Sequence, residues 1–277
     1  MKKPLFPIIA IVGVGLIGGS IGLAVKKRRL AKLVIGIGRR KSSVLDALKK
    51  GAIDVGVLDM DAVGSADLVI LAAPVTTIAK QMKALAPHLK KGAVVIDAGS
   101  SKALITDAAK KYLHKNTFVG CHPMAGKERS GVAAAEAGLF EDSVCFITAR
   151  HAKVEAFWKA IGSRPVVLGA EAHDRLIGSM SHTPHAIAFS LFQNKKDYPS
   201  GLPVNPSMRE LSRLAKSDPS IWADILVSNR QAVLRSVEEF EKKGVHPLKN
   251  LLRKGNTPAL ARFIAVANKN SSRLRAS

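Results

Sequence analysis

Short runs of branched apolar residues recur along the first 168 residues, and segments with helical spacing separate them. The runs expected as strands lie at 8–12, 33–37, 67–73, 93–97, 117–121, 143–148 and 165–168. Several consist almost entirely of Val and Ile, which is typical of strands buried on both faces of a parallel sheet. Helices are expected between them at 16–29, 42–50, 75–89, 102–113 and 153–162. This alternation predicts a doubly wound α/β domain over residues 1–168.

The pattern changes after residue 168, where no further strand is expected. Long helical patterns cover about 170–194, 206–215, 218–243 and 257–270. Asp218 and Pro219 fit the N-cap and the first position of the third of these helices. The sequence therefore predicts an all-helical C-terminal domain over residues 169–277.

A glycine-rich turn follows the first expected strand and precedes the first expected helix. It reads Gly13-Val14-Gly15-Leu16-Ile17-Gly18, a GxGxxG pattern. In this setting the first glycine permits a tight turn, the second lets the backbone approach a pyrophosphate, and the third lets helix and strand pack closely. We expect a Rossmann-type site in which Gly13, Gly15, Leu16, Ile17 and Gly18 bind a dinucleotide at the helix N-terminus.

The end of the second expected strand bears on which dinucleotide is bound. An acidic residue there would accept hydrogen bonds from the ribose 2′-OH of NAD. The sequence instead continues with Gly38, Arg39 and Arg40, and Ser42 and Ser43 follow. Arginine pairs bidentately with phosphate, so NADP is expected as the preferred cofactor, with Arg39, Arg40 and Ser43 among its ligands. An arginine that only stacks on adenine would leave NAD possible.

The chain is strongly basic, with 43 Lys and Arg against 21 Asp and Glu and a formal net charge of +22. Twelve basic residues and one acid fall within residues 1–53, and residues 242–277 hold nine basic residues and no acid. Such charge attracts anions, including nucleic acids, phosphates and carboxylates. A general basic bias with solvated lysines explains it equally well, since aromatic residues, at 5%, are sparse among the basic ones.

The apolar content of 47% suffices for a core, and no uncharged apolar run is long enough for a membrane span. Residues 1–16 resemble a signal peptide, but their glycine turn fits a first strand better. Two cysteines, Cys121 and Cys145, cannot form a disulfide framework. A cytoplasmic protein is the expectation.

The segment CHPMAGKERSG, residues 121–131, begins at the end of an expected strand. Ligands of doubly wound sheets lie beyond the carboxyl ends of the strands, so His122 is expected near the nicotinamide. A neutral imidazole there can accept a proton near pH 7, which makes His122 a candidate base.

This segment resembles the HPMAG-x-E-x-SG signature of the prephenate/arogenate dehydrogenases of tyrosine biosynthesis. Further similar segments occur in order along the chain: GVGLIGGSIG, DAGSSK at 97–102, HD at 173–174, SHTPHAIAF at 181–189 and RLAKSDPSIW at 213–222. The resemblance implies a Rossmann domain followed by a helical dimerisation domain, as in 6-phosphogluconate-dehydrogenase-like enzymes. It also implies a homodimer through the helical domain and a small dicarboxylate substrate.

The resemblance implies a role for individual residues as well. His122 would take the proton of the substrate hydroxyl, and Ser100 would bond the same hydroxyl or orient His122. Arg213 would bind a substrate carboxylate, His185 would contact the substrate side chain, and His182 would lie by the cofactor. Glu128 occupies the acidic position of the signature, where it would gate the substrate site or pair with a neighbouring cation. A metal is not expected, because His182 and His185 lack a matched third ligand.

Two other functions remain open at this level. The first is another NADP-dependent oxidoreductase of the same two-domain plan, acting on a β-hydroxyacid or an imine. The second is a basic nucleic-acid-binding regulator that senses NAD(P), although no helix-turn-helix, zinc or RNP-like motif supports it. No nucleic-acid or membrane partner is expected, and prephenate and arogenate are not distinguished.

Overall fold

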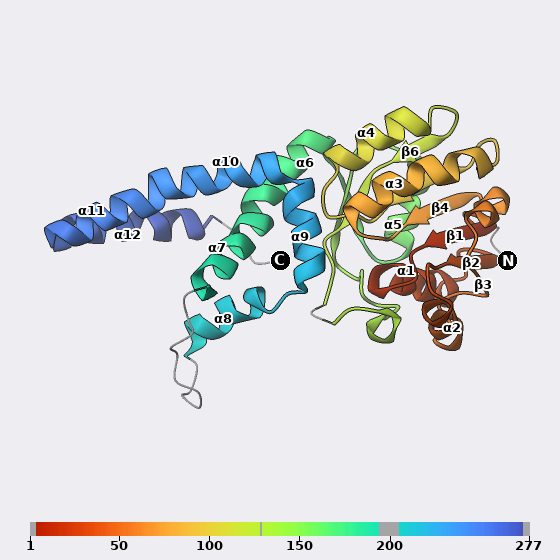
Figure 1. Ribbon diagram of the computed structural model, residues 1–277, viewed down its shortest axis with the longest axis horizontal. Coiled ribbons are helices and arrows are strands. Elements are labelled where there is room, and N and C mark those ends of the chain that lie inside the picture. Colours follow the sequence, from red (N-terminus) through yellow and green to blue (C-terminus); the bar gives the residue numbers. More distant parts are fainter. Residues whose placement is uncertain (1–3, 128, 194–204, 274–277) are drawn as a thin grey trace. The chain divides into compact units, whose positions relative to one another are not determined.

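The computed structural model describes residues 4–127, 129–193 and 205–273. The N-terminal part of the chain contains a six-stranded parallel sheet, ordered β3-β2-β1-β4-β5-β6 (Figure 1). Its strands are β1 (Ile8–Val12), β2 (Leu33–Ile37), β3 (Val55–Val57), β4 (Leu68–Leu71), β5 (Val94–Asp97) and β6 (Thr117–Val119). Strand β1 pairs with both β2 and β4. Strands β2 and β3 therefore lie on one side of β1 and strands β4 to β6 on the other, as in a doubly wound fold.

Helices cover both faces of this sheet, which confirms the predicted fold class. They are α1 (Leu16–Lys27), α2 (Lys41–Lys49), α3 (Val75–Leu85), α4 (Ala103–Tyr112) and α5 (Ala152–Ala160). Successive residues of a strand point to opposite faces of the sheet. In β1, Ile9 and Ile11 pack with α1, α2 and α5, whereas Ala10 and Val12 pack with α3 and α4. The strands are therefore apolar on both faces, and this produces the continuous apolar runs in the sequence.

A second, three-stranded sheet continues from the edge of the first. Its strands are β7 (Cys121–Pro123), β8 (Val144–Ile147) and β9 (Arg164–Val167). Strand β7 pairs antiparallel with β8, and β8 pairs parallel with β9. The run expected as one strand at 117–121 thus divides at Gly120 between two sheets, and His122 lies in the middle of β7.

The helices after residue 169 begin with α6 (Ala170–Ile177) and α7 (Thr183–Phe192), joined by a π-helical turn over Gly178–His182. Pro184 lies in the first turn of α7, which continues directly from the π turn, and it has no N–H to donate at this point of the helix. The π turn therefore absorbs the break that Pro184 imposes on the helix expected over 170–194, a recurrent arrangement at functional sites.

The remaining helices are α8 (Pro206–Ala215), α9 (Pro219–Ser228), α10 (Arg230–Phe240), α11 (His246–Lys254) and α12 (Thr257–Ser271). A second π turn, Glu241–Val245, precedes α11. Asp218 caps α9 by accepting hydrogen bonds from the backbone N–H groups of Ser220 and Ile221. The chain forms two compact units, one up to Arg230 and one from Gln231 onwards. No helix in the described part of the chain is long and apolar enough to cross a membrane.

Three elements differ from the prediction. Strand β3 was not expected, because it is short and half exposed at the sheet edge. Helix α11 was not expected either, since it carries many charges. The helix expected over 218–243 breaks at Asn229, whose side chain donates to the backbone carbonyl of Asp174 and bonds His182 Nδ1. Such tertiary contacts leave no mark on hydrophobic periodicity.

Candidate active site

The glycine turn has the geometry that a dinucleotide needs. Gly13 has φ +100°, and a Cβ there would lie 2.5 Å from the carbonyl oxygen of Ala72. A Cβ on Gly18 would lie 2.0 Å from the Gly13 carbonyl oxygen, so this position requires glycine for α1 to pack on the turn. A Cβ on Gly15 would meet nothing within 4 Å. The backbone at Gly15 is therefore open to a ligand, at the N-terminus of a helix with no side-chain cap.

A pocket of about 370 Å³ opens beside this turn. Gly15, Leu16 and Ile17 form one wall, and Ser100 lies on the segment after β5. Further walls come from residues 72–75, from the loop after β7 and from α9, which contributes Trp222 and Ile225. Asp224 of α9 accepts hydrogen bonds from Thr76 at the start of α3, which ties α9 to the sheet at this edge. The pocket thus lies at the carboxyl ends of β1, β4 and β5, where such sheets bind ligands.

The end of β2 has no acidic side chain and no space for one at Gly38. A Cβ on Gly38 would lie 2.5 Å from Cγ2 of Val44. Gly38 therefore serves the packing of α2 on the strand, rather than leaving space for a phosphate as its position suggests. The next residues, Arg39 and Arg40, are exposed, and Ser43 is half buried in the first turn of α2. None of these three lines the pocket, although the end of β2 adjoins the glycine turn, since the N–H of Gly13 donates to the carbonyl oxygen of Ile37 at 2.8 Å.

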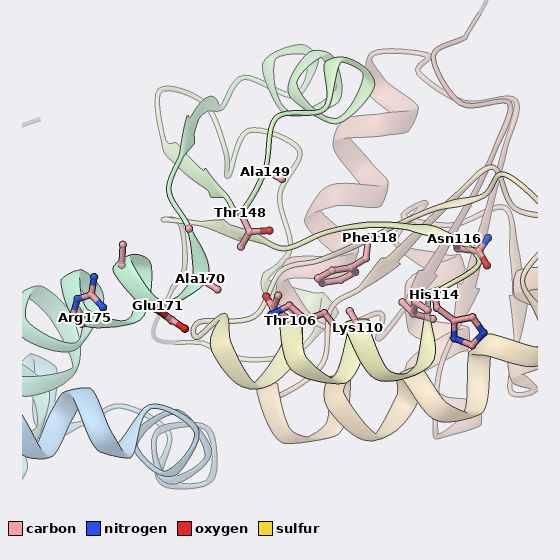
Figure 2. A pocket seen from close by; sticks show the side chains of 14 residues that line it. Thr106, Lys110, His114, Asn116, Phe118, Thr148, Ala149, Ala170, Glu171 and Arg175 are labelled. Carbon is pink, nitrogen blue, oxygen red and sulfur yellow. The ribbon is translucent and has the colours of Figure 1, made fainter.

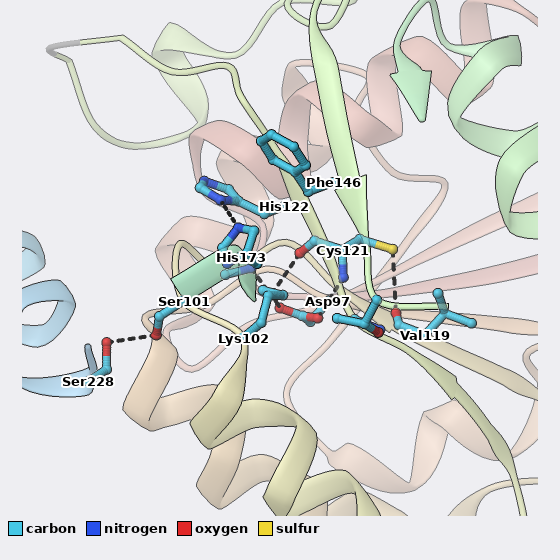
Figure 3. Close-up of polar contacts among 12 residues, drawn as sticks. Asp97, Ser101, Lys102, Val119, Cys121, His122, Phe146, His173 and Ser228 are labelled. Carbon is cyan, nitrogen blue, oxygen red and sulfur yellow. Dashed lines mark hydrogen bonds and ion pairs between the residues drawn. The ribbon is translucent and has the colours of Figure 1, made fainter. Parts of the chain in front are cut away.

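His122 lies in β7 with 9% of its surface exposed, and it contacts a second histidine that has none (Figure 3). Its Nδ1 is 2.9 Å from Nε2 of His173, and Nδ1 of His173 is 2.8 Å from Oδ1 of Asp174. Burial lowers the pKa of His122 well below its ordinary value, and the nearby side chains of His173, Lys102 and His182 act in the same direction. The imidazole is therefore neutral near pH 7 and able to accept a proton.

A buried ion pair fixes the backbone directly before His122. Lys102 and Asp97 are both fully buried and in contact with each other. Nζ of Lys102 donates to the carbonyl oxygen of Cys121 at 2.7 Å, and Oδ1 of Asp97 accepts from the N–H of Cys121 at 3.0 Å. Both hydrogen-bonding groups of Cys121 are thus held, which fixes the position from which His122 projects (Figure 3).

His182 and His185 meet at Trp222. The ring of His185 stacks on the indole with centroids 3.6 Å apart, and the ring of His182 meets it edge-on at 6.0 Å. Burial lowers the pKa of His182 to about 4. Burial also lowers the pKa of His185, and the positive charge of Arg213 acts in the same direction. The electrostatic influence of Arg213, on α8, thus reaches His185.

The predicted site residues fall into three groups. Ser100, Gly15, Leu16 and Ile17 line the pocket, whereas His122 lies in β7, three residues before the pocket wall at Ala125. His182 and His185 cluster around Trp222 without lining the pocket themselves, Arg213 lies on α8, and Arg39, Arg40 and Ser43 follow the end of β2. Glu128 lies outside the described residues. Its neighbour Lys127 forms an ion pair with Glu136 at 2.5 Å.

Sequence reasoning missed several residues that the structure places around His122. His173 and Asp174 were recognised only as the letters HD, and Asp97 and Lys102 only as the ends of DAGSSK. Trp222 was not among the predicted site residues, yet it lines the pocket. Of the first four, only Asp97 directly follows an apolar run, and a charged residue there is a usable signal because such residues are rarely buried without partners.

A larger hollow, of about 620 Å³, lies elsewhere, between α4, β6 and the start of α6 (Figure 2). Its lining includes Lys110, Phe118 and Arg175. No predicted site residue contributes to it, and it lies away from the glycine turn. The chemistry therefore points to the smaller pocket. Among the residues that the structure describes, no group of three His, Cys, Asp or Glu side chains is arranged to hold a metal ion.

Two family models match the chain. Residues 21–167 match the nucleotide-binding domain of prephenate dehydrogenase, and residues 169–266 match its dimerization domain. The chain belongs to the prephenate dehydrogenase family. Its relatives in this family include the prephenate dehydrogenase of Lactococcus lactis, 34% identical over 87% of this chain and 69% of that protein. The cyclohexadienyl dehydrogenase of Zymomonas mobilis is 33% identical over 85% of both chains.

Solved structures of the family have the same fold. Prephenate dehydrogenase from Aquifex aeolicus superposes with a TM-score of 0.87 at 30% identity, over 96% of this chain and 99% of that one. The same enzyme in complex with hydroxyphenyl propionate and NAD+ gives a TM-score of 0.85. Arogenate dehydrogenase from Synechocystis, at 24% identity and a TM-score of 0.81, shows the same fold.

Proposed function

We propose that this prephenate dehydrogenase family member oxidises and decarboxylates prephenate or arogenate, with NADP preferred over NAD. The observation that carries the proposal is the neutral, buried imidazole of His122 in the strand that leads to the pocket wall at Ala125, together with a glycine turn that fits a dinucleotide. A bound nicotinamide would accept hydride from C4 of the substrate ring. The ring carboxylate leaves as CO2 and the ring becomes aromatic, so the protein has to bind carboxylates and remove one hydroxyl proton.

Each of the predicted site residues has a proposed role in this reaction. His122 accepts the proton of the C4 hydroxyl as a general base. Ser100, on the pocket wall, bonds the same hydroxyl or orients His122. Arg213 holds a substrate carboxylate, His185 contacts the substrate side chain from its position on Trp222, and Glu128 gates the substrate site. His182 lies toward the cofactor.

The cofactor would be held by Gly13, Gly15, Leu16, Ile17 and Gly18 at the N-terminus of α1. Preference for NADP rests on Arg39, Arg40 and Ser43. Position 38 has no room for the carboxylate that NAD enzymes place there, because a Cβ would overlap Val44. Arg39 and Arg40 are exposed, so a 2′-phosphate can reach them without displacing packed side chains.

The molecule is proposed to act as a cytoplasmic homodimer. Its dinucleotide-binding domain would comprise residues 1–168 and its substrate and dimerisation domain residues 169–277. The two family models support this division, since they meet between residues 167 and 169. The name of the second model, a dimerization domain, supports assembly through the helices.

Steady-state kinetics with purified protein would test the activity. Prephenate and arogenate are each assayed with NADP and with NAD, and reduced nicotinamide and released CO2 are both measured. The proposal predicts equal yields of the two products with at least one substrate. Reduced cofactor without CO2, or no turnover of either substrate, would contradict it.

A further inference from the structure

We propose that His173 and Asp174 are positioning residues that keep the proton of His122 on Nδ1 and leave its Nε2 as the free acceptor. The three side chains form one chain of hydrogen bonds. The assignment of protons follows from the structure alone, and its use in catalysis rests on the proposed function.

The carboxylate of Asp174 determines which group donates and which accepts in each of these hydrogen bonds. Asp174 accepts from the backbone N–H of Lys102 at 2.7 Å and from that of Ala103 at 2.9 Å. Both donors lie at the start of α4, where unpaired N–H groups stabilise negative charge. An ionised carboxylate has no proton to donate. The group facing it, Nδ1 of His173, therefore carries a proton and donates it to Asp174.

The proton position on His173 then determines the proton position on His122. When the ring of His173 holds a single proton, on Nδ1, its Nε2 has a lone pair. Because this Nε2 is 2.9 Å from Nδ1 of His122, the second ring must be the donor. His122 consequently carries its proton on Nδ1, and its Nε2 holds a lone pair. No hydrogen bond of that Nε2 is found in the described part of the chain, and 9% of the residue remains exposed.

This arrangement suits a base that accepts a proton at one defined nitrogen, Nε2. The hydroxyl proton of the substrate moves to Nε2 of His122, and the imidazolium formed keeps its Nδ1–H bond to His173. The negative charge of Asp174, one ring further on, stabilises the new positive charge without taking a proton. A carboxylate that orients a histidine in this way is a recurrent device in enzymes that use histidine as a base.

Packing alone is the competing explanation for His173. Its ring meets Phe146 edge-on at 5.6 Å and is fully buried, so an apolar side chain of similar size could fill the space. A packing role predicts a loss of stability only. The proposed role predicts a change in the protonated nitrogen of His122 and in kcat, and these can be measured separately from stability.

The most direct test is nitrogen NMR of the free protein with labelled histidine, because the nitrogen shifts show which ring atom carries the proton. The proposal predicts that both His122 and His173 carry their proton on Nδ1 at neutral pH. The signals of the two residues are assigned by their loss in the His122→Asn and His173→Gln variants. A proton on Nε2 of His122 would overturn the proposed proton arrangement. This result does not depend on the substrate, so it is distinguishable from failure of the proposed function.

Kinetics of two variants give the second test. His173→Leu removes the acceptor that faces His122, and kcat is expected to fall about 10- to 100-fold, part of the 10²–10⁴ that a positioned base contributes. The KM for substrate should change little. His173→Gln restores an acceptor near the former Nε2 and should recover part of the loss.

A matched control separates this effect from general destabilisation. His151→Leu removes a histidine whose ring accepts a hydrogen bond from the N–H of Val154 at the start of α5. Its melting temperature is expected to fall while kcat stays normal. If His173→Leu is folded and keeps the kcat of the unmodified enzyme, or if His173→Gln and His173→Leu are equally impaired, the positioning role is contradicted.

Discussion

The charge state of His122 decides at which pH the enzyme can work. Burial lowers the pKa of this imidazole well below the usual value of about 6.5, and His173, Lys102 and His182 add to the shift. The neutral, reactive form is therefore present at all pH values above the lowered pKa, and it is lost only as pH falls through it. We predict that kcat/KM stays flat from neutral pH to below about 6.5. An acid limb centred at or above that value would contradict the assignment.

Arg213 is the residue expected to bind a substrate carboxylate. Removal of one charged hydrogen bond costs roughly 1.5–3 kcal/mol, so Arg213→Ala should raise KM by about ten- to hundredfold. Arg213→Lys should recover only part of this, because lysine lacks the planar fork of arginine. Arg209→Ala, one turn away on α8, is the control for a change of charge alone. Equal KM values for the Arg213→Ala and Arg209→Ala enzymes would assign the carboxylate to another residue.

Sequence reasoning at this scale identified His122 as the proposed base but did not identify the residues around it. His122 was identified because it follows a strand and because the loop after it resembles a family signature. His173 and Asp174 lie 51 and 52 residues further on, and only the fold brings them beside it. Their contact depends on the packing of α6 on α4, which periodicity cannot specify.

The turn between β2 and α2 is the element proposed to select the cofactor. Arg39→Ala should reduce the preference for NADP over NAD by roughly 1.5–3 kcal/mol, mostly through KM for NADP. Lys49→Ala, at the far end of α2, removes the same charge without touching the turn and should leave the preference unchanged. If the unmodified enzyme favours NAD tenfold or more in kcat/KM, the arginines serve the adenine ring or the solvent.

Elements with strong periodicity were predictable, and those defined by tertiary contacts were not. The strands β1 and β2 coincide with their predicted runs, since each is buried on both faces. Strand β3 has too little burial to produce a pattern, and the break at Asn229 depends on contacts with Asp174 and His182. The division of the chain at Gly120 between two sheets is also invisible in an unbroken apolar run.

Assembly is the property of the whole molecule that follows from its surface. Several large apolar side chains of the second compact unit are exposed in the single chain, among them Leu234, Leu252, Ile264 and Val266, each half exposed or more. Burial of such groups favours association. Light scattering at micromolar concentration is expected to give twice the monomer mass of 29.5 kDa.

Charge substitutions would locate the interface. Leu252→Lys together with Val266→Glu should shift the protein toward monomer, whereas Leu58→Lys, exposed near β3, should not. A monomer mass for the unmodified chain would argue against assembly through the helices.

The central claim is that His122 removes the hydroxyl proton during oxidation of prephenate or arogenate. The measurement that tests it most directly is kcat of His122→Asn, with folding verified by the melting temperature. Asparagine keeps the polarity of the side chain but cannot act as a base near neutral pH. We predict a fall in kcat of about 10²–10⁴-fold with little change in KM for substrate. A folded His122→Asn enzyme with near-normal kcat would show that the proton leaves by another route.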